Sequence, residues 1–574
     1  MKERIKDYLI ILIFTLIVSF PFVSNNIDVY VDDGIQHIAR LMGTFQSIED
    51  KGEIFPVIMS NFCNGFGYSW NIFYSPFTAY VPMIFRLFTN SYELIFKLFM
   101  VFISFLSGIA MYEFVKKVTQ NRYAGLLASC MYIFVPYRLT DMYLRYAIAE
   151  LASFIFLPIT FLGMYNIFNS EEKSLKKSLI LTLGAVGLIL THIVMAMYTA
   201  IFCFIYLLLN IKKLKEKEIL KMLGINILLI ILLSSFYLLP MLEHKLNTQY
   251  EVFQSGRMEN TKTLIDSKTG ILDLFYTPNG KLVKEIGFVI LIGLVLTPIA
   301  FKKIDKSYKM IYWFSLIMGL VNIILSLKIF PFEKMPEILK MIQFTFRLLE
   351  FSSFFFIFVA AVNYSVAIKN FQMNDVVVLS TICILLFIPF VKRIDFKKDW
   401  KEEQLWPSVA VNNYTGRVHA GCATFEYLPS KAFNNLDYIK NRENAIYILK
   451  GYANIENEKK SGSYMQFDLS EVENDTKLEL PYIYYLGYEA TLENSNGNQK
   501  INISESENGF VQINLNNEDS GTITIRYTGT LLMKISWFIS FATLIILICV
   551  WVWKLINKKI IKECSDKKEQ ATSK

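Results

Sequence analysis

The chain has 574 residues, of which 53% are hydrophobic and 19% are charged, and its net charge at pH 7 is +8. Soluble domains carry charge on roughly a quarter of their residues, so this composition excludes an ordinary soluble protein and predicts an integral membrane protein. The lysines gather in short runs between apolar segments. The positive-inside rule accounts for this pattern, which argues against a nucleic-acid partner.

Apolar stretches that can cross a membrane, which takes about twenty residues, recur along the chain. The first follows the basic Met1–Lys6 without a small-residue cleavage site, so we expect a retained span. The stretch 178–210 would be about 50 Å long as one helix, and we expect two short helices with a break near Thr191-His192. This predicts twelve spans with both termini cytoplasmic. The candidates are 7–23, 92–115, 123–138, 148–168, 178–210, 219–241, 286–301, 308–329, 345–367, 374–391 and 531–553.

The stretch from Val31 to Arg40 places two adjacent carboxylates, Asp32 and Asp33, where the chain leaves the first span. If a helix begins here, Asp33, His37 and Arg40 share one face. The residues Ile38, Leu41, Met42 and Phe45 form another, which we expect on a membrane surface. Alternatively, Asp33 only caps the helix, with Gln36 completing a capping box. Its position at the membrane boundary favours a functional site.

Whether the short stretch 77–90 crosses the membrane decides on which side the later loops lie. The stretch is apolar, but it contains Pro82 and Arg86. If it lies on the surface or re-enters without crossing, most basic loops fall on the cytoplasmic side. We therefore expect a surface-lying or re-entrant segment. The predicted parts are a multispan domain 1–393 with a first outer loop 24–91, an extracytoplasmic domain 394–530, a C-terminal span 531–556 and a cytoplasmic tail 557–574.

Charged residues cluster again after the third span, at Arg138, Asp141, Arg145 and Glu150. Asp141 and Arg145 are four residues apart, which fits a local ion pair. Glu150 begins an apolar span, where an acid is costly unless it is paired or faces water. The alternative to a structural pair is an arginine that binds phosphate and is oriented by carboxylates.

Three further residues are candidates for substrate contacts. His192 lies at the expected helix break, where a hydrogen-bonded structural role is the usual one. Arg347 opens a span, where it can reach lipid headgroups or a phosphate. Tyr74 belongs to an aromatic cluster that suits an interfacial belt or stacking against a sugar or prenyl chain.

Short alternating apolar runs separated by polar clusters fill the region before the last span. Asn508-Gly509 is a hairpin turn signal. The region therefore predicts a small antiparallel β-sandwich. The runs are 464–470, 476–492, 500–506, 510–516 and 521–528.

Metal and nucleotide sites have little support in the sequence. The histidines 37, 192, 244 and 419 lack metal-ligand spacing, and no phosphate-binding glycine loop is present. A divalent cation held by Asp32 and Asp33 is an open alternative. Of the seven cysteines, Cys63 and Cys422 would both lie outside the cell; a disulfide is conceivable there, but we expect two thiols.

Taken together, these motifs resemble the GT-C superfamily of multispan glycosyltransferases, and more closely a group of bacterial membrane proteins labelled "6-pyruvoyl-tetrahydropterin synthase related". Thr345 and Phe346 depart from the Q-F-P-W-R type of run expected at that point. A pterin synthase would need a compact zinc-binding histidine set on a soluble fold, and the sequence offers neither. The residues that carry the resemblance are Asp33-x-x-x-His37-x-x-Arg40, Asn64–Pro76, Pro136-Tyr137…Arg145…Glu150, Gln343–Arg347, Glu426–Pro429 and Pro481–Tyr485.

The resemblance implies an inverting transfer of a sugar from a polyprenyl-phosphate donor to an envelope polysaccharide or lipid, on the outer face of a bacterial plasma membrane. Asp33 would be the general base, with Asp32 as the alternate. Arg145 and Arg347 would contact the leaving phosphate, while His37 and Glu150 would orient neighbours. The alternatives are a transporter or flippase, and a non-enzymatic glycan-binding envelope protein.

Overall fold

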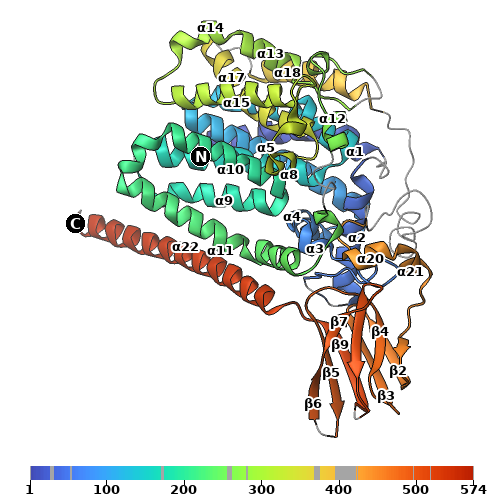
Figure 1. Cartoon of the computed structure of the whole chain (residues 1–574). Coiled ribbons are helices and arrows are strands. Elements are labelled where there is room, and N and C mark those ends of the chain that lie inside the picture. The colour runs from blue at the N-terminus through green and yellow to red at the C-terminus, as the bar shows by residue number, and fades with distance from the viewer. Residues whose placement is uncertain are drawn as a thin grey trace.

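The structure, a computed structural model, describes residues 2–25, 32–51, 53, 55–169, 173–254, 261–278, 282–367, 375–394, 422, 425–495, 497–517 and 519–572. A helical bundle forms one part of the molecule, and two β-sheets lie at one end of it (Figure 1). Among these residues, seven helices are long and apolar enough to cross a membrane. They lie within α1 (Lys2–Ser24), α5 (Tyr92–Thr119), α8 (Ile148–Asn169), α11 (Lys217–Asn247), α15 (Lys309–Ser326), α17 (Leu348–Ala367) and α22 (Leu531–Thr572).

The other predicted spans are present as shorter helices, and the total of twelve crossings stays a prediction. The break at Thr191-His192 is confirmed, because His192 has extended backbone between two helices. The helix after Asn121 ends at Phe134, since Val135 precedes Pro136 and is extended. The stretch 286–301 is split at Leu296. These shorter helices are α6 (Arg122–Phe134), α9 (Leu175–Thr191), α10 (Ile193–Leu209), α13 (Phe288–Val295), α14 (Thr297–Ala300) and α18 (Asp375–Val391).

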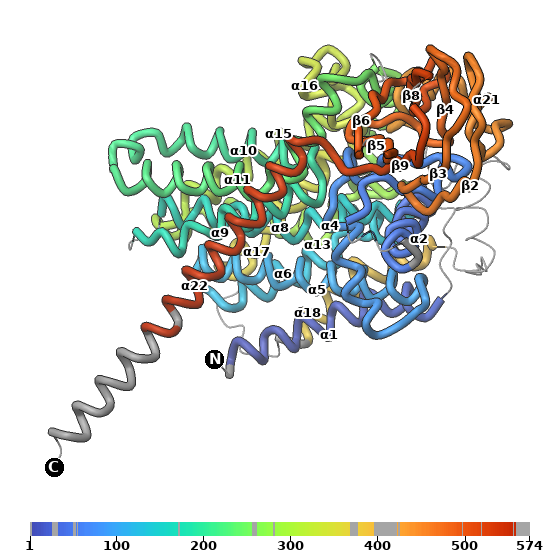
Figure 2. The backbone as a smooth tube through the Cα atoms, turned by 90° about the horizontal axis from the view of Figure 1, so that it is seen from below, coloured from blue at the N-terminus to red at the C-terminus, as the bar shows by residue number. Residues whose placement is uncertain are grey.

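The helices α8 and α17 form the centre of the bundle. In their most apolar stretches, 89% and 100% of the residues are buried, whereas in that of α22 only 11% are buried. The helix α22 runs along the flank of the bundle (Figure 2). Its exposed apolar side chains are typical of a lipid-facing helix. Glycines bring α8 and α9 close together. A Cβ on Gly163 would lie 2.3 Å from the Leu181 backbone, and one on Gly184 would lie 2.5 Å from the Thr160 backbone. Such close approach is typical of helix contacts in membranes.

The first outer loop contains α2 (Gly34–Lys51), α3 (Trp70–Phe73), α4 (Phe77–Tyr80) and the 3₁₀ helix η1 (Val81–Leu87). The expectation that the apolar face of α2 lies on a membrane surface is wrong. Ile38, Met42 and Phe45 are at most 1% exposed, because α2 packs against α4 and α5. The segment 77–90 contains α4 and η1, both short, and its surface-lying or re-entrant position stays a prediction.

Two antiparallel sheets form the C-terminal β region, with strand orders β1-β4-β8-β7 and β2-β3-β9-β5-β6. Both contribute side chains to one core, among them Leu478 and Ile513 from the first sheet and Phe467 and Ile523 from the second. The run 476–492 is two strands rather than one. The hairpin turn at Asn508-Gly509 is confirmed, since Gly509 has a φ of 83° before β8. The strands are β1 (Tyr447–Lys450), β2 (Asn454–Ser461), β3 (Tyr464–Ser470), β4 (Thr476–Ile483), β5 (Tyr488–Asn494), β6 (Gly497–Ile501), β7 (Ile503–Glu505), β8 (Phe510–Leu515) and β9 (Gly521–Tyr527).

Short helical turns connect these parts. Three of them bear on the candidate site: α7 (Pro136–Thr140), the π-helical turn η2 (Asp141–Arg145) and the 3₁₀ turn η8 (Thr345–Arg347). The others are η3 (Ile211–Lys215), η4 (Glu251–Phe253), α12 (Thr261–Asp266), η5 (Leu272–Leu274), η6 (Phe301–Lys303), η7 (Phe332–Lys334), α16 (Glu337–Lys340), α20 (Ser430–Asn434) and α21 (Leu436–Asn441).

Candidate functional site

Two tight turns bring the acidic end of the first outer loop to the start of α8. Asp33 directly precedes α2, and its backbone N–H donates to the Arg145 carbonyl at 3.0 Å. Arg145 ends the turn η2, after which Tyr146 takes left-handed backbone with a φ of 52°. Asp32 also has a positive φ, 37°. Non-glycine residues in this region are strained, and such positions cluster at functional sites.

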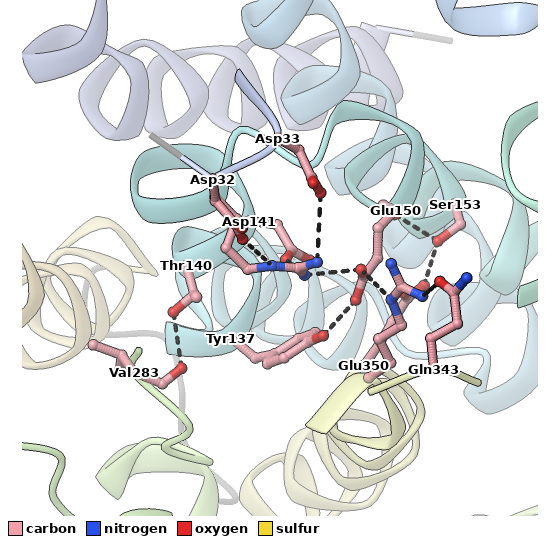
Figure 3. A network of polar contacts seen from close by, with 12 residues as sticks. Asp32, Asp33, Tyr137, Thr140, Asp141, Glu150, Ser153, Val283, Gln343 and Glu350 are labelled. Atoms are coloured by element: carbon pink, nitrogen blue, oxygen red, sulfur yellow. Dashed lines mark hydrogen bonds and ion pairs between the residues drawn. The ribbon is translucent and has the colours of Figure 1, made fainter. Parts of the chain in front are cut away.

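The Arg145 guanidinium is the centre of the site and contacts four carboxylates, which converge on it in Figure 3. Its nitrogens lie 2.6 Å from Asp141, 2.8 Å from Glu150, 3.2 Å from Asp32 and 3.7 Å from Asp33. Arg145 is only 1% exposed. A buried guanidinium is tolerated only when it is paired and hydrogen-bonded, so these acids explain its position.

Glu150 joins Arg145 to a second arginine. Arg347 Nε lies 3.1 Å from a Glu150 carboxylate oxygen. Arg347 also donates to the Gln343 side-chain oxygen at 2.7 Å and to the Ile342 carbonyl at 3.1 Å. The Tyr137 hydroxyl donates to the other Glu150 oxygen. The structure thus brings together Glu150, Arg145 and Arg347, which the sequence analysis treated as parts of one site.

The cluster contains more acids than arginines. Glu350, from the next turn of the helix after Arg347, approaches Glu150 through Ser153, whose hydroxyl oxygen lies 2.5 Å from the Glu350 carboxyl and 2.6 Å from the Glu150 carbonyl. Burial, and then the charge of Glu150, raise the pKa of Asp141 well above its usual value against the opposing effect of Arg145. Asp141 Oδ2 has no hydrogen-bond partner in the described part of the chain, so this buried carboxyl is bonded to Arg145 through its other oxygen.

Asp32 and Asp33 form the accessible edge of this buried network. Their side chains are 54% and 34% exposed, whereas those of Asp141 and Glu150 are 0% and 1% exposed. Partial burial and the adjacent Asp33 carboxylate raise the pKa of Asp32, while Arg145 opposes this shift. A substrate approaching the cluster would therefore meet these two aspartates before the arginines.

His37, Arg40 and Tyr74 form a second group beside the cluster, close enough that the charge of Arg145 acts on His37 and that of Asp33 on Tyr74. Arg40 is 2% exposed, and its donors bind the Asn71 side chain at 2.8 Å and the Tyr74 and Ser75 carbonyls at 3.1 and 3.0 Å. Its guanidinium also lies 4.7 Å from the Tyr74 ring centre. With its donors taken by protein acceptors, Arg40 fixes the segment after Trp70 in place.

His37 contacts the same tyrosine, with its ring centre 5.6 Å from that of Tyr74. Burial, followed by the charges of Arg40 and Arg145, lowers the pKa of His37 to about 3. It is therefore neutral near pH 7. Its Nδ1 is buried and has no hydrogen-bond partner among the described residues.

His192 lies at the junction of α9 and α10, where its Nδ1 accepts a bond from the Met195 backbone N–H at 3.4 Å. This is the structural capping role that a helix break permits. Its imidazole also lies within electrostatic range of Glu150 and Arg347. The structure therefore places His192 beside the cluster.

Three residues of the cluster escaped the site prediction. Tyr137 stands in the quoted P-Y-R motif without any feature that marks its hydroxyl, and Ser153 looks like any small residue of an apolar helix. Glu350 carried a usable signal, since an acid inside an apolar span is itself a functional pointer. The departure at Thr345 does not remove the local turn, because Gln343 takes a φ of 62° and η8 forms without proline.

Metal-binding groups of three or more His, Cys, Asp or Glu side chains are absent from the part of the chain that the structure describes. Asp32 and Asp33 alone offer two partly exposed carboxylates. This donor set suits a hydrated ion such as Mg²⁺, which takes one or two carboxylates and completes its shell with water and phosphate.

A family model described as "6-pyruvoyl-tetrahydropterin synthase related domain; membrane protein" matches residues 72–395. An uncharacterized protein of Lactococcus lactis subsp. cremoris is 30% identical over 356 residues, which are 58% of this chain and 55% of that protein, so the chain spans about half the length of this relative. The apo crystal structure of an Archaeoglobus fulgidus oligosaccharyltransferase aligns with 76% of this chain and 58% of that one, at 14% identity and a TM-score of 0.37. The family model covers more than half of the residues of this chain. The chain therefore belongs to the family of membrane proteins with the 6-pyruvoyl-tetrahydropterin synthase related domain.

Proposed function

We propose that this protein is a membrane glycosyltransferase that moves a sugar from a polyprenyl-phosphate donor to a cell-envelope acceptor, with inversion at the anomeric carbon. The observation that carries the proposal is the buried cluster around Arg145, in which two accessible aspartates contact Arg145 and Glu150 joins Arg145 to Arg347. A carboxylate base that takes the proton of the acceptor and cations that stabilise the leaving phosphate are the two requirements of this reaction.

In the proposed reaction, Asp33 takes the proton of the acceptor hydroxyl while that oxygen attacks the anomeric carbon. The bond from the anomeric carbon to the phosphate oxygen breaks, and the phosphate leaves with the electron pair. Asp33 suits the role because its carboxylate is 34% exposed and its contact with Arg145, at 3.7 Å, is the longest of the four. Asp32, held at 3.2 Å, is the alternate base.

Arg145 and Arg347 are the proposed contacts for the phosphate. Both already bind Glu150, which holds the two guanidiniums in a fixed relation before a substrate arrives. Such preorganised charge lowers the barrier because it needs no reorganisation during the reaction. Asp141, Glu150 and His192 are positioning residues in this scheme, as are His37, Arg40 and Tyr74 beside the cluster.

The excess of carboxyls gives a divalent cation a place in the proposal. Asp32 and Asp33 would hold it, and it would supply positive charge for the donor phosphate. The same two carboxylates contact Arg145, so the arginine and the ion would share the task of balancing their charge.

The test compares envelope glycans and lipid-linked sugars, by mass spectrometry, in cells that make the wild-type protein, no protein, Asp33→Asn or Asp32→Asn. Loss of a general base costs roughly 10²- to 10⁴-fold in rate, so Asp33→Asn should abolish the product while the protein is made and inserted normally. Asp32→Asn is the matched control and should lose less of the product than Asp33→Asn. Unchanged product with Asp33→Asn would refute the assignment of the base.

The same cells distinguish the alternatives. A transporter or flippase would move its substrate across sealed vesicles without a covalent product, and a glycan-binding protein would be insensitive to Asp33→Asn. The buried ion pairs of Glu150 with both arginines favour a fixed charge cluster over a conducting path.

A further inference from the structure

Two cysteines that are far apart in the sequence meet between the first outer loop and the segment that leads to the β region. The sulfur atoms of Cys63 and Cys422 lie 3.1 Å apart, although 359 positions separate the residues. Both side chains are fully buried. The sulfurs are only about 1 Å farther apart than in a disulfide bond, so a small movement of either side chain would join them.

Cys63 is presented by a strained turn. Its φ is 52° and that of Asn64 is 61°, and both are left-handed conformations that non-glycine residues seldom adopt. The turn is closed by backbone hydrogen bonds from Phe66 N–H to the Cys63 carbonyl and from Gly67 N–H to the Phe62 carbonyl, both 3.0 Å. Strain of this kind persists only where the surroundings fix the backbone.

The β region supplies part of that fixation. The Ile483 N–H donates to the Phe66 carbonyl at 2.9 Å. The Lys460 Nζ donates to the Gly65 carbonyl and to the Pro481 carbonyl, both at 2.8 Å. These bonds hold the turn against the sheets from which Lys460 and Ile483 come.

Cys422 is fixed from the other side by Tyr68, five positions after Cys63. The Tyr68 hydroxyl donates to the Cys422 carbonyl at 3.0 Å and accepts from the Tyr427 N–H at 3.1 Å. The Ser69 hydroxyl donates to the Tyr427 carbonyl at 3.0 Å. The two chain segments are therefore aligned by several bonds that do not involve sulfur.

We propose that Cys63 and Cys422 form a disulfide in the mature protein and that this bond ties the loop bearing Asp32 and Asp33 to the β region. The inference goes beyond the proposed transferase activity. It rests instead on the contact of the two sulfurs and on the outer-face position predicted for both segments, where the environment would be oxidising.

The chemistry is a thiol–disulfide exchange with an oxidant of the disulfide class. One cysteine thiolate attacks a sulfur of the oxidant, a mixed disulfide forms, and the first oxidant sulfur leaves as a thiolate. The second cysteine then attacks the mixed disulfide and releases the other oxidant sulfur. The two cysteines are oxidised by two electrons, the oxidant is reduced to two thiols, and these take up the two protons.

Burial determines when this exchange takes place. It raises the pKa of the Cys63 thiol well above its usual value, and a protonated, inaccessible thiol is a poor nucleophile. Oxidation therefore precedes the final packing of the β region on the loop. After packing, the same burial shields the bond from external reductants.

The experiment uses the full chain from cells quenched with acid, so that thiols stay protonated and do not exchange. The protein is then denatured near neutral pH without reductant in excess N-ethylmaleimide, which alkylates buried thiols as well as exposed ones, and it is digested and analysed by mass spectrometry. We expect Cys63 and Cys422 to escape alkylation and to appear as one cross-linked peptide pair that reductant separates. The proposal is overturned if both carry the alkyl group before reduction, or if either is linked to another cysteine.

Variants sharpen this result. Cys63→Ser should leave Cys422 open to alkylation without reductant. Cys203→Ser, a half-buried cysteine of α10, is the matched control and should leave the cross-linked pair intact. Continued protection of Cys422 in Cys63→Ser would overturn the assignment. Because the readout is a covalent link and not sugar transfer, its failure is distinguishable from failure of the proposed function.

Discussion

Replacement of Glu150 by glutamine tests whether the arginine cluster is held by charge. Glutamine has nearly the same shape but no charge, so it leaves Arg145 and Arg347 in place while removing the carboxylate that both contact, at 2.8 and 3.1 Å. Removing one partner of a buried ion pair costs about 3 to 5 kcal/mol. Arg145 keeps Asp141, and Arg347 keeps the Gln343 oxygen, so we expect about 3 kcal/mol.

Glu350→Gln is the matched control, because Glu350 has the same side chain and is equally buried. One of its carboxyl oxygens contacts the neutral hydroxyl of Ser153, and the other has no hydrogen-bond partner in the described residues. Loss of one neutral hydrogen bond costs about 1 kcal/mol. The two substitutions should therefore lower the free energy of unfolding by different amounts, although each replaces a buried glutamate by glutamine.

Thermal unfolding of the detergent-solubilised protein, followed by size-exclusion chromatography, is the assay. Glu150→Gln should lower the Tm by on the order of 5 °C, and Glu350→Gln by much less. Equal shifts for the two variants, or no shift for Glu150→Gln, would refute the view that buried charge pairing organises the cluster.

Three further predictions concern packing, pH and metal. Gly163→Ala should lower the Tm, because its Cβ would lie 2.3 Å from the Leu181 backbone. Gly224→Ala is the control: its Cβ would meet nothing within 4 Å, so the Tm should stay unchanged or rise. Equal effects of the two substitutions would contradict the close packing of α8 on α9. Burial lowers the pKa of Lys460 to about 7, below its usual 10.5, so the unfolded chain holds more protons between pH 7 and 10 and wild-type stability should rise with pH there relative to Lys460→Met. Parallel Tm profiles for the two proteins over this range would argue against a neutral buried lysine. Transfer measured in membranes should be lost with EDTA and restored by Mg²⁺ or Mn²⁺, and EDTA-resistant activity would leave the phosphate to Arg145 and Arg347 alone.

Sequence reasoning found the parts of the site because each carried a local physical signal. Asp33 stands at a membrane boundary, Glu150 is an acid in an apolar span, and Arg347 opens another span. Their convergence followed from the resemblance to a family and not from spacing, since the contact of Arg347 with Glu150 joins residues 197 positions apart. No pattern along the chain reports such a distance.

Other predictions failed where tertiary contacts outweighed a local pattern. The apolar side of α2 has the periodicity of a membrane-surface helix, but α4 and α5 cover it, and Ile38 is fully buried. The alternation of the run 476–492 did not show where one strand ends, and Gly487, with a φ of 111°, turns the chain from β4 in one sheet to β5 in the other. The cysteines gave no spacing signal either, and only the fold shows that Cys63 and Cys422 adjoin.

The Asp33 N–H bond to the Arg145 carbonyl has a consequence for biogenesis. The aspartates leave the ribosome first, and their main-chain acceptor is synthesised more than a hundred residues later, just ahead of α8. Arg347 follows about two hundred residues after Arg145. Until that segment is inserted, Glu150 has one guanidinium instead of two, so chains arrested before α17 should be preferred substrates for membrane quality-control proteases.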